Sequence, residues 1–134
     1  MLSVIADTNV FLRFLTNDIP SQAQSIEKRF KEVQEGKLSL VVLPITVVEI
    51  LFQLENWYKF SRQEAAEKLM LLFSPSWLEL EDKEAVFEAF TIYKESKIDF
   101  VNILIFTLAK KRNSKILSFD KDYDKLLPKL RVTP

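Results

Sequence analysis

The chain has 134 residues, a length typical of one domain, and it contains no cysteine, no histidine and a single glycine. These absences exclude disulfides, thiolate zinc sites, imidazole acid–base chemistry and glycine-rich phosphate loops. Basic and acidic residues number 19 each, so the chain has no overall positive field that would mark nucleic-acid binding. We expect a single domain over residues 1–134, whose chemistry rests on carboxylates, hydroxyls, amides, Lys, Arg or Tyr.

The beginning of the chain reads as a short buried strand, residues 2–6, which ends at Asp7. A short helix over residues 10–15 follows. Ligands of open parallel sheets bind outside the carboxyl ends of the strands, which makes Asp7 a candidate for chemistry. Aspartate is also a favoured N-cap, so Asp7 could equally serve only to begin the helix.

A second helix is predicted from Pro20, because Ala23, Ile26, Phe30 and Val33 recur at helical spacing and proline suits a first turn. Gly36 ends this helix well, and residues 38–43 form a β-prone run that predicts the second strand.

Residues 45–57 predict a third helix, opened by Pro44, that is apolar nearly all round and therefore buried. Glu49 lies inside this run. A lone carboxylate there is costly unless it is paired or binds a metal ion. The alternative is that Glu49 faces solvent near the helix start, where the helix dipole favours it. The lack of a visible solvent stripe favours the functional interpretation.

The second half of the chain continues the alternation of helices and strands. Ser61 and Glu64 match a capping box at the start of a fourth helix, residues 77–80 predict a strand, and a fifth helix begins near Asp82. A sixth helix covers residues 98–109, with Asp99 as a natural N-cap and Asn102 as a polar side chain in an apolar run. Residues 115–119 predict a strand that ends at Asp120, and residues 130–132 a last edge strand.

This order predicts an α/β domain of three layers, with a central, mostly parallel sheet of 4–5 strands flanked by helices. Asp7 and Asp120 each follow a strand. Glu49 and the Asp99–Asn102 pair lie early in buried helices. We expect all of these residues at or near the carboxyl edge of the sheet.

Several carboxylates brought together repel one another, by about 4 kcal/mol for a pair 4 Å apart at an effective dielectric of about 20. They therefore take up protons or bind a cation. Oxygen ligands suit Mg²⁺ or Mn²⁺, which can activate water and stabilise the oxygens of an in-line phosphodiester displacement. Metal-assisted hydrolysis is the most economical chemistry for this set of residues.

The sequence resembles the PIN-domain nucleases, particularly the VapC-type toxin ribonucleases of toxin–antitoxin pairs. Four segments carry the resemblance in the expected order, and it extends over essentially the whole chain. They are Asp7-Thr8-Asn9-Val10-Phe11-Leu12-Arg13-Phe14-Leu15, Pro44-Ile45-Thr46-Val47-Val48-Glu49, Asp99-Phe100-Val101-Asn102 and Leu117-Ser118-Phe119-Asp120-Lys121-Asp122. The resemblance implies a PIN-like fold and a Mg²⁺- or Mn²⁺-dependent endoribonuclease, usually dimeric and inhibited by a cognate antitoxin.

Carried over by position, the resemblance implies that Asp7, Glu49 and Asp120 are the catalytic metal ligands, with Asp122 as an accessory acid. Further residues would support them around the metal or the substrate. Thr8, Asn9 and Ser118 would hold water or carboxylates. Apart from the resemblance, the basic side chains of Arg13, which lies just beyond Asp7, and Lys121 could contact RNA phosphates.

The departure from the family pattern is Asn102, which stands where the third acid is usual. Asp99, one turn earlier, could partly substitute as a ligand beside the Asn102 carbonyl oxygen. The alternative function is therefore a catalytically weakened PIN-fold protein that binds RNA or an antitoxin.

Location and assembly follow from coarser features. The absence of cysteine fits a cytoplasmic protein, and no apolar run is long enough to predict a membrane span. Trp57, Tyr58 and Phe60 near a predicted helix end suggest an interface for a homodimer, although core burial is the commoner explanation for such residues.

Overall fold

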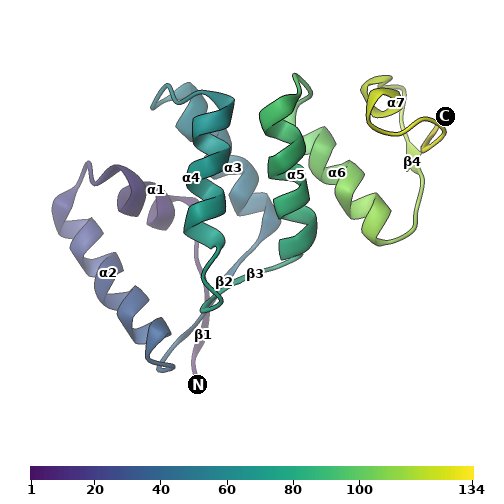
Figure 1. The fold of residues 1–134 in the computed structure, drawn as a ribbon. Coiled ribbons are helices and arrows are strands. Elements are labelled where there is room, and N and C mark those ends of the chain that lie inside the picture. Colours follow the sequence, from purple (N-terminus) through teal and green to yellow (C-terminus); the bar gives the residue numbers. More distant parts are fainter. The chain divides into compact units, whose positions relative to one another are not determined.

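The computed structural model describes all 134 residues and contains seven helices and five strands (Figure 1). The chain divides into two compact units, Met1–Glu81 and Asp82–Pro134, which are described one after the other. No helix has both the length and the apolar character needed to cross a membrane. The predicted α/β class, with parallel strands and flanking helices, is confirmed, but the strands form one parallel sheet of three strands and one of two in place of a single sheet of 4–5 strands.

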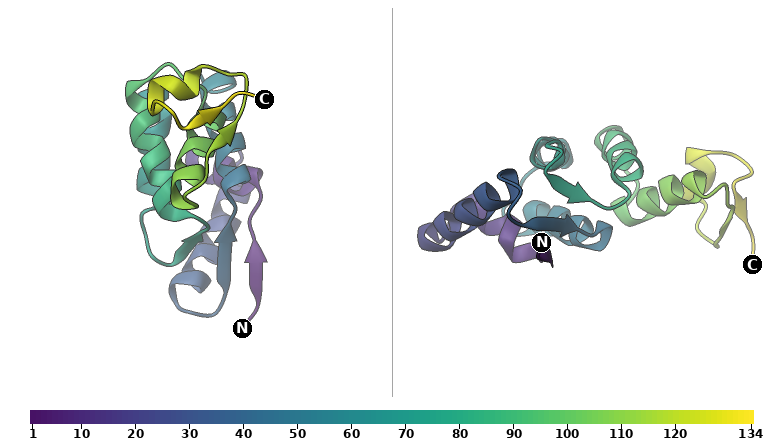
Figure 2. Two further views of the ribbon diagram at one scale, coloured as in Figure 1. Left: turned by 90° about the vertical axis from the view of Figure 1, so that its right-hand side faces the viewer. Right: turned by 90° about the horizontal axis from the view of Figure 1, so that it is seen from below.

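The first unit is built around a parallel sheet of three strands in the order β1-β2-β3. Figure 2 shows the arrows of β1 (purple) and β2 (blue) side by side and pointing the same way. Val4 pairs with Leu40, and Leu40 pairs with Leu78. In chain order the elements are β1 (Ser3–Ile5), α1 (Thr8–Thr16), α2 (Pro20–Gln34), β2 (Ser39–Val42), α3 (Pro44–Asn56), α4 (Arg62–Phe73) and β3 (Leu78–Leu80).

Aromatic packing holds α1 against its neighbours in this unit. Phe11 is fully buried and contacts Phe30 of α2 and Phe73 of α4, with ring centroids 6.2 and 5.3 Å apart. Such a buried aromatic ring contributes several kcal/mol, since removing one from a core typically costs about 3–5 kcal/mol. The packing fixes α1, and hence the residues at its N-terminus.

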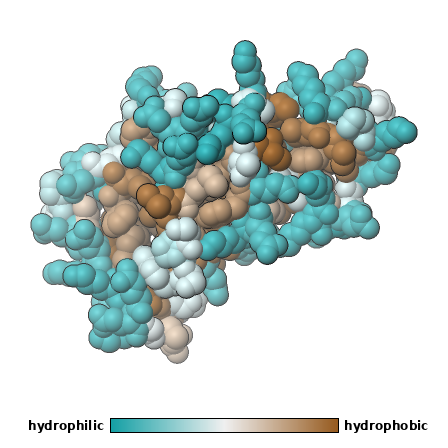
Figure 3. Space-filling model, viewed as in Figure 1, coloured by the Kyte–Doolittle hydropathy of each residue, from teal (hydrophilic) through white to brown (hydrophobic).

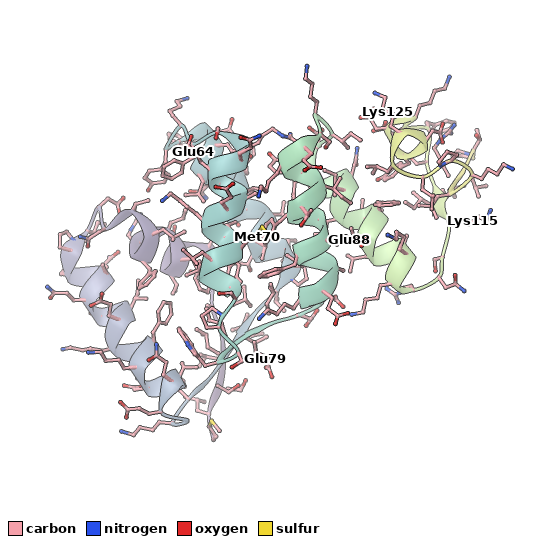
Figure 4. All side chains as sticks on the ribbon, in the orientation of Figure 1. Glu64, Met70, Glu79, Glu88, Lys115 and Lys125 are labelled. Carbon is pink, nitrogen blue, oxygen red and sulfur yellow. The ribbon has the colours of Figure 1, made fainter.

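The predicted helix signals are present in the structure. Gly36 has a φ of +77°, a conformation that favours glycine, and it follows the end of α2. The capping box is also confirmed. The Ser61 hydroxyl accepts from the Glu64 N–H, and the Glu64 side chain, labelled in Figure 4, accepts from the Ser61 N–H.

The prediction that α3 is buried all round is wrong for one face. Ile45 and Phe52 are 74% and 60% exposed, and Glu49 lies exposed between them in the sequence. The other faces hold the buried side chains, among them Val47 and Ile50. The solvent-facing stripe was invisible in the sequence because large apolar residues form most of it.

The second unit consists of two packed helices followed by a small strand pair. Its elements are α5 (Lys83–Glu95), α6 (Phe100–Lys111), β4 (Ile116–Leu117), α7 (Asp122–Leu126) and β5 (Arg131–Val132). Phe100 stacks on Phe90 at 5.4 Å and meets Tyr93 edge-on at 5.3 Å, which locks α6 onto α5. β4 and β5 pair in parallel, with Ile116 opposite Arg131.

A separate hydrophobic cluster fixes the C-terminal part of this unit. Phe106, Ala109, Ile116 and Tyr123 are buried together, and this places α7 against α6. The sequence analysis assigned no helix to residues 122–126. Helix α7 is only 5 residues long, too short for a periodic pattern, and burial of Tyr123 holds it in place.

Candidate functional site

Asp7 lies at the end of β1 and directly before α1. It is the N-cap residue by position, with extended backbone angles, but its side chain makes no capping hydrogen bond. Asp7 is exposed. The Asp7 carboxylate therefore does not cap the helix, and it remains available for other chemistry.

Glu49 is held in a defined orientation by two neutral donors. The Thr8 hydroxyl donates to Glu49 Oε2 at 3.0 Å, and the Gln53 amide donates to Oε1 at 3.3 Å. Thr8 is only 8% exposed, so its hydroxyl is fixed by packing. Because Thr8 follows Asp7 directly in the chain, this hydrogen bond ties the start of α1 to α3, and both Asp7 and Glu49 are exposed.

Arg13 is engaged within its own unit. Its Nη1 donates to Asp18 at 3.2 Å and its Nε donates to the Gln22 carbonyl oxygen at 3.2 Å. Asp18 also accepts from the Thr16 and Tyr58 hydroxyls. Burial by itself would raise the pKa of Asp18, but the two hydroxyl hydrogen bonds and the charge of Arg13 together hold that pKa below its usual value.

In the second unit, Asp120 is the centre of a hydrogen-bond network. Its Oδ2 accepts from the Asn102 amide at 3.0 Å, and its Oδ1 accepts from the Asp122 N–H at 2.9 Å. The Asp120 N–H in turn donates to the Ser118 hydroxyl at 2.9 Å. The Asp120 side chain is exposed, yet its orientation is set by these bonds.

Asn102 joins Asp120 to the buried Tyr123. The Tyr123 hydroxyl donates to the Asn102 carbonyl oxygen at 3.2 Å, while the Asn102 amide nitrogen serves Asp120. Burial raises the pKa of the Tyr123 hydroxyl, and the negative charge of Asp120 adds to this shift. Tyr123 therefore stays a neutral donor, and Asn102 is oriented with its nitrogen toward the carboxylate.

The remaining predicted residues of this unit are less constrained or are paired elsewhere. Asp99 is the N-cap of α6 by position, is exposed, and makes no capping bond. Asp122 forms an ion pair with Lys125, labelled in Figure 4, at 3.1 Å. Lys121 is exposed. In the first unit, Asn9 at the start of α1 is exposed as well.

The residues that support the hydrogen-bond network around Asp120 were not predicted from the sequence. Arg131 makes a bidentate ion pair with Asp124 and donates to the Ser118 carbonyl oxygen at 3.1 Å. The Arg131 guanidinium lowers the pKa of Asp124. Tyr123 gave no periodic signal, because Asp120 lies outside the short helix α7 that carries Tyr123. Arg131 carried no signal either, since a strand pairing brings it close.

Chemically, each unit presents oxygen atoms that suit a hard cation, but neither groups three acidic side chains closely enough to hold a metal ion alone. The first unit brings Thr8 to Glu49. The second brings Ser118, Asn102, Asp120 and Tyr123 together.

Comparison with known proteins gives the family. The family model described as "PIN domain" matches residues 4–126 of the chain. The chain is 28% identical over 123 residues to a VapC ribonuclease of Aquifex aeolicus (strain VF5), a match that covers 91% of this chain and 90% of that protein. No solved structure matches the chain. The order of acidic segments and the extent of the family match lead to one conclusion: this chain belongs to the PIN domain family.

Proposed function

We propose that the protein is a divalent-metal-dependent endoribonuclease that acts as the toxin of a type II toxin–antitoxin pair. The PIN domain match and the similarity to a VapC ribonuclease support this function. The observation that carries it is the state of Asp7, whose exposed carboxylate follows the first strand and is not used to cap the following helix.

We propose Asp7, Glu49 and Asp120 as the ligands of Mg²⁺ or Mn²⁺. The donor chemistry fits, because all three offer exposed carboxylate oxygens, and the only donors bound to them are neutral. Asp99, Asp122 and Asn102 lie in the matching acidic segments and are proposed as accessory ligands. The ion, when bound, would activate water and stabilise phosphate oxygens.

The chain's own residues would orient these ligands and the substrate. Thr8 holds Glu49, and Asn102 holds Asp120. Residues of this kind, which orient metal ligands, typically change affinity or activity by roughly 10- to 100-fold when removed. Asn9 and Ser118 are proposed in the same supporting role. Lys121, exposed beside Asp120, is proposed to contact the RNA backbone.

One observation favours the catalytically weakened alternative. The Asn102 carbonyl oxygen, the atom that would bind a metal ion, accepts from the Tyr123 hydroxyl. Asn102 therefore orients the Asp120 carboxylate and brings no negative charge of its own to a metal ion. A PIN-fold protein that binds RNA or an antitoxin with little cleavage would show RNA binding without metal-dependent turnover.

The decisive experiment is cleavage of structured RNA by the full chain with Mn²⁺, with Mg²⁺ or with EDTA. We expect cleavage that EDTA abolishes and that Asp7→Asn lowers by roughly 100-fold or more, which corresponds to a few kcal/mol of lost charge stabilisation. Glu79→Gln, the same change at an exposed carboxylate of β3, is the matched control and should leave cleavage unchanged. Cleavage that persists in EDTA would remove the metal mechanism.

The proposed protein partner is a cognate antitoxin. Figure 3 shows hydrophobic side chains at the surface between α2 and α4, where a hollow of about 330 Å³ is lined by Phe14, Leu71 and Trp77 among others. Leu71 is 77% exposed, which suits the apolar face of a partner helix. Leu71→Asp should weaken binding of the cognate antitoxin. Unchanged binding would place the antitoxin elsewhere.

A homodimer is the proposed assembly. Of the three aromatic residues expected near the end of α3, Trp57 is 75% exposed, whereas Tyr58 donates to Asp18 and Phe60 is half-buried beneath Lys68. Light scattering at high micromolar concentration should show a dimer that Trp57→Ala weakens. A monomer at that concentration would contradict this proposal.

A further inference from the structure

A hollow of about 390 Å³ lies beside Asp7, between α1 and the beginning of α2. This volume is within the range of about 300–1000 Å³ typical of small-ligand sites. Half-buried Val10 and Ile26 give it apolar surface, which suits the face of a nucleobase. Its polar side chains are Asp7, Asn9, Arg13, Ser21, Gln22 and Ser25.

One of these side chains has a fixed orientation. Arg13 is held from two directions, by Asp18 at its Nη1 and by the Gln22 carbonyl oxygen at its Nε. Asp18 is itself fixed by hydroxyl hydrogen bonds from Thr16 and Tyr58. Arg13 is therefore already oriented by the protein, which lowers the entropy lost when it binds a ligand.

The same contacts decide which hydrogen-bonding groups remain for a ligand. The carbonyl oxygen of Gln22 is used by Arg13, which leaves the Gln22 amide nitrogen as a donor. The Nη2 of Arg13 is a second donor in the same hollow. The pair thus presents two donors and needs a ligand edge with two neighbouring acceptors.

On the Hoogsteen edge, which faces the major groove in a duplex, guanine alone among the nucleobases meets this requirement. Its N7 and O6 are adjacent acceptors, whereas the corresponding edge of adenine has one acceptor and one donor, and that of cytosine carries a donor. Single-stranded RNA offers such edges because its bases can be splayed out and bound individually.

We propose that this hollow binds one unpaired guanine of an RNA substrate, next to the phosphodiester that is cut at Asp7, and that Gln22 and Arg13 select it. The inference deepens the proposed ribonuclease function and rests on it for the position of the cut. Asp18 acts as a positioning residue, because it orients Arg13 and does not touch the RNA.

The test measures binding separately from cleavage. The full chain, in EDTA, is titrated into a fluorescent oligouridine that carries one guanine, and fluorescence anisotropy is recorded. The same strand with adenine or with 7-deazaguanine, which lacks only the N7 acceptor, should bind about tenfold more weakly, the scale of one good base-edge contact. Gln22→Ala should remove this preference, while Gln24→Ala, an exposed amide two residues along α2, should keep it.

Cleavage in Mn²⁺ then gives the second readout. Wild type and Gln24→Ala should cut preferentially next to guanine, and Gln22→Ala should cut the guanine and adenine strands without that preference. Equal binding of the guanine, adenine and 7-deazaguanine strands, or an unchanged preference in Gln22→Ala, would overturn the inference. A guanine preference in binding with no metal-dependent cleavage would instead overturn the proposed function and leave this site standing.

Discussion

Asp7 in the first unit and Asp120 in the second are held by the fold in opposite ways. In the first, Asp7 makes no capping bond, although it stands where a helix cap is expected. In the second, Asp120 accepts from both Asn102 and the Asp122 N–H. A carboxylate that is not tied to the fold can be changed without loss of stability, whereas one that accepts two hydrogen bonds also supports the structure around it.

The sharpest way to break this comparison is to neutralise each carboxylate. Asp7→Asn and Asp120→Asn should each lower metal-dependent RNA cleavage by roughly 100-fold or more. Their melting temperatures in EDTA should differ. Asp7→Asn should melt at or above the wild-type temperature. Asp120→Asn should melt lower, because the Asn side chain has only one oxygen and cannot accept the two hydrogen bonds that the Asp120 carboxylate takes at separate oxygens. Equal melting temperatures would show that the two carboxylates contribute equally to the stability of the fold.

Thr8→Val tests whether the first unit depends on orientation as well. The substitution keeps the shape of the buried side chain and removes only the hydroxyl that donates to Glu49. Cleavage should fall by roughly 10- to 100-fold, the usual cost of losing a group that orients a metal ligand. Thr91→Val, which removes a hydroxyl bonded within α5, is the control. A similar loss in both variants would point to a general effect on the fold.

Asn102→Asp would make the second unit more like the expected family pattern. It would replace the amide that donates to Asp120 by a second carboxylate, and two such charges about 4 Å apart repel by roughly 1–4 kcal/mol depending on solvent exposure. Stability in EDTA should fall, and Mn²⁺ affinity should rise by about tenfold because a bound ion relieves that repulsion. Lower stability with unchanged affinity would assign Asn102 a purely structural role.

The smallest expected effect concerns pH and the Arg13–Asp18 pair. The pKa of Asp18 is lowered in the folded chain, so this group contributes stability above its unfolded pKa of about 3.9, and that contribution is lost as the pH falls through the lower folded value. Urea unfolding should show Asp18→Asn less stable than wild type near neutral pH, with the difference shrinking below about pH 4. A difference that does not change with pH would mean that the charge of Asp18 is unimportant.

The sequence predicted the elements well because local chemistry specifies them. Proline at the start of α2 and α3, Gly36 after α2 and the Ser61–Glu64 capping box each act over a few residues. The exposed face of α3 escaped prediction, because Ile45 and Phe52 look like core residues in any local pattern.

For the site, sequence could name the acidic residues but not their partners. Asp7, Glu49 and Asp120 stand at recognisable places, after a strand or early in a helix. The hydrogen bonds of Thr8 to Glu49 and of Asn102 to Asp120 join residues 41 and 18 positions apart, and only the folded chain brings such pairs together. The pairing of Arg13 with Asp18 likewise depends on the turn between α1 and α2.

The central proposal is that Asp7 and Asp120 are ligands for a divalent metal ion, and calorimetric titration with Mn²⁺ tests it most directly. The titration compares wild type, Asp7→Asn, Asp120→Asn and the double variant, with Glu79→Gln as the control. We predict a single ion per chain in the wild type, a large loss of affinity in either single variant, and a combined loss in the double variant that is smaller than the sum of the two. Two weak and independent ions, each lost with only one of the substitutions, would contradict the account.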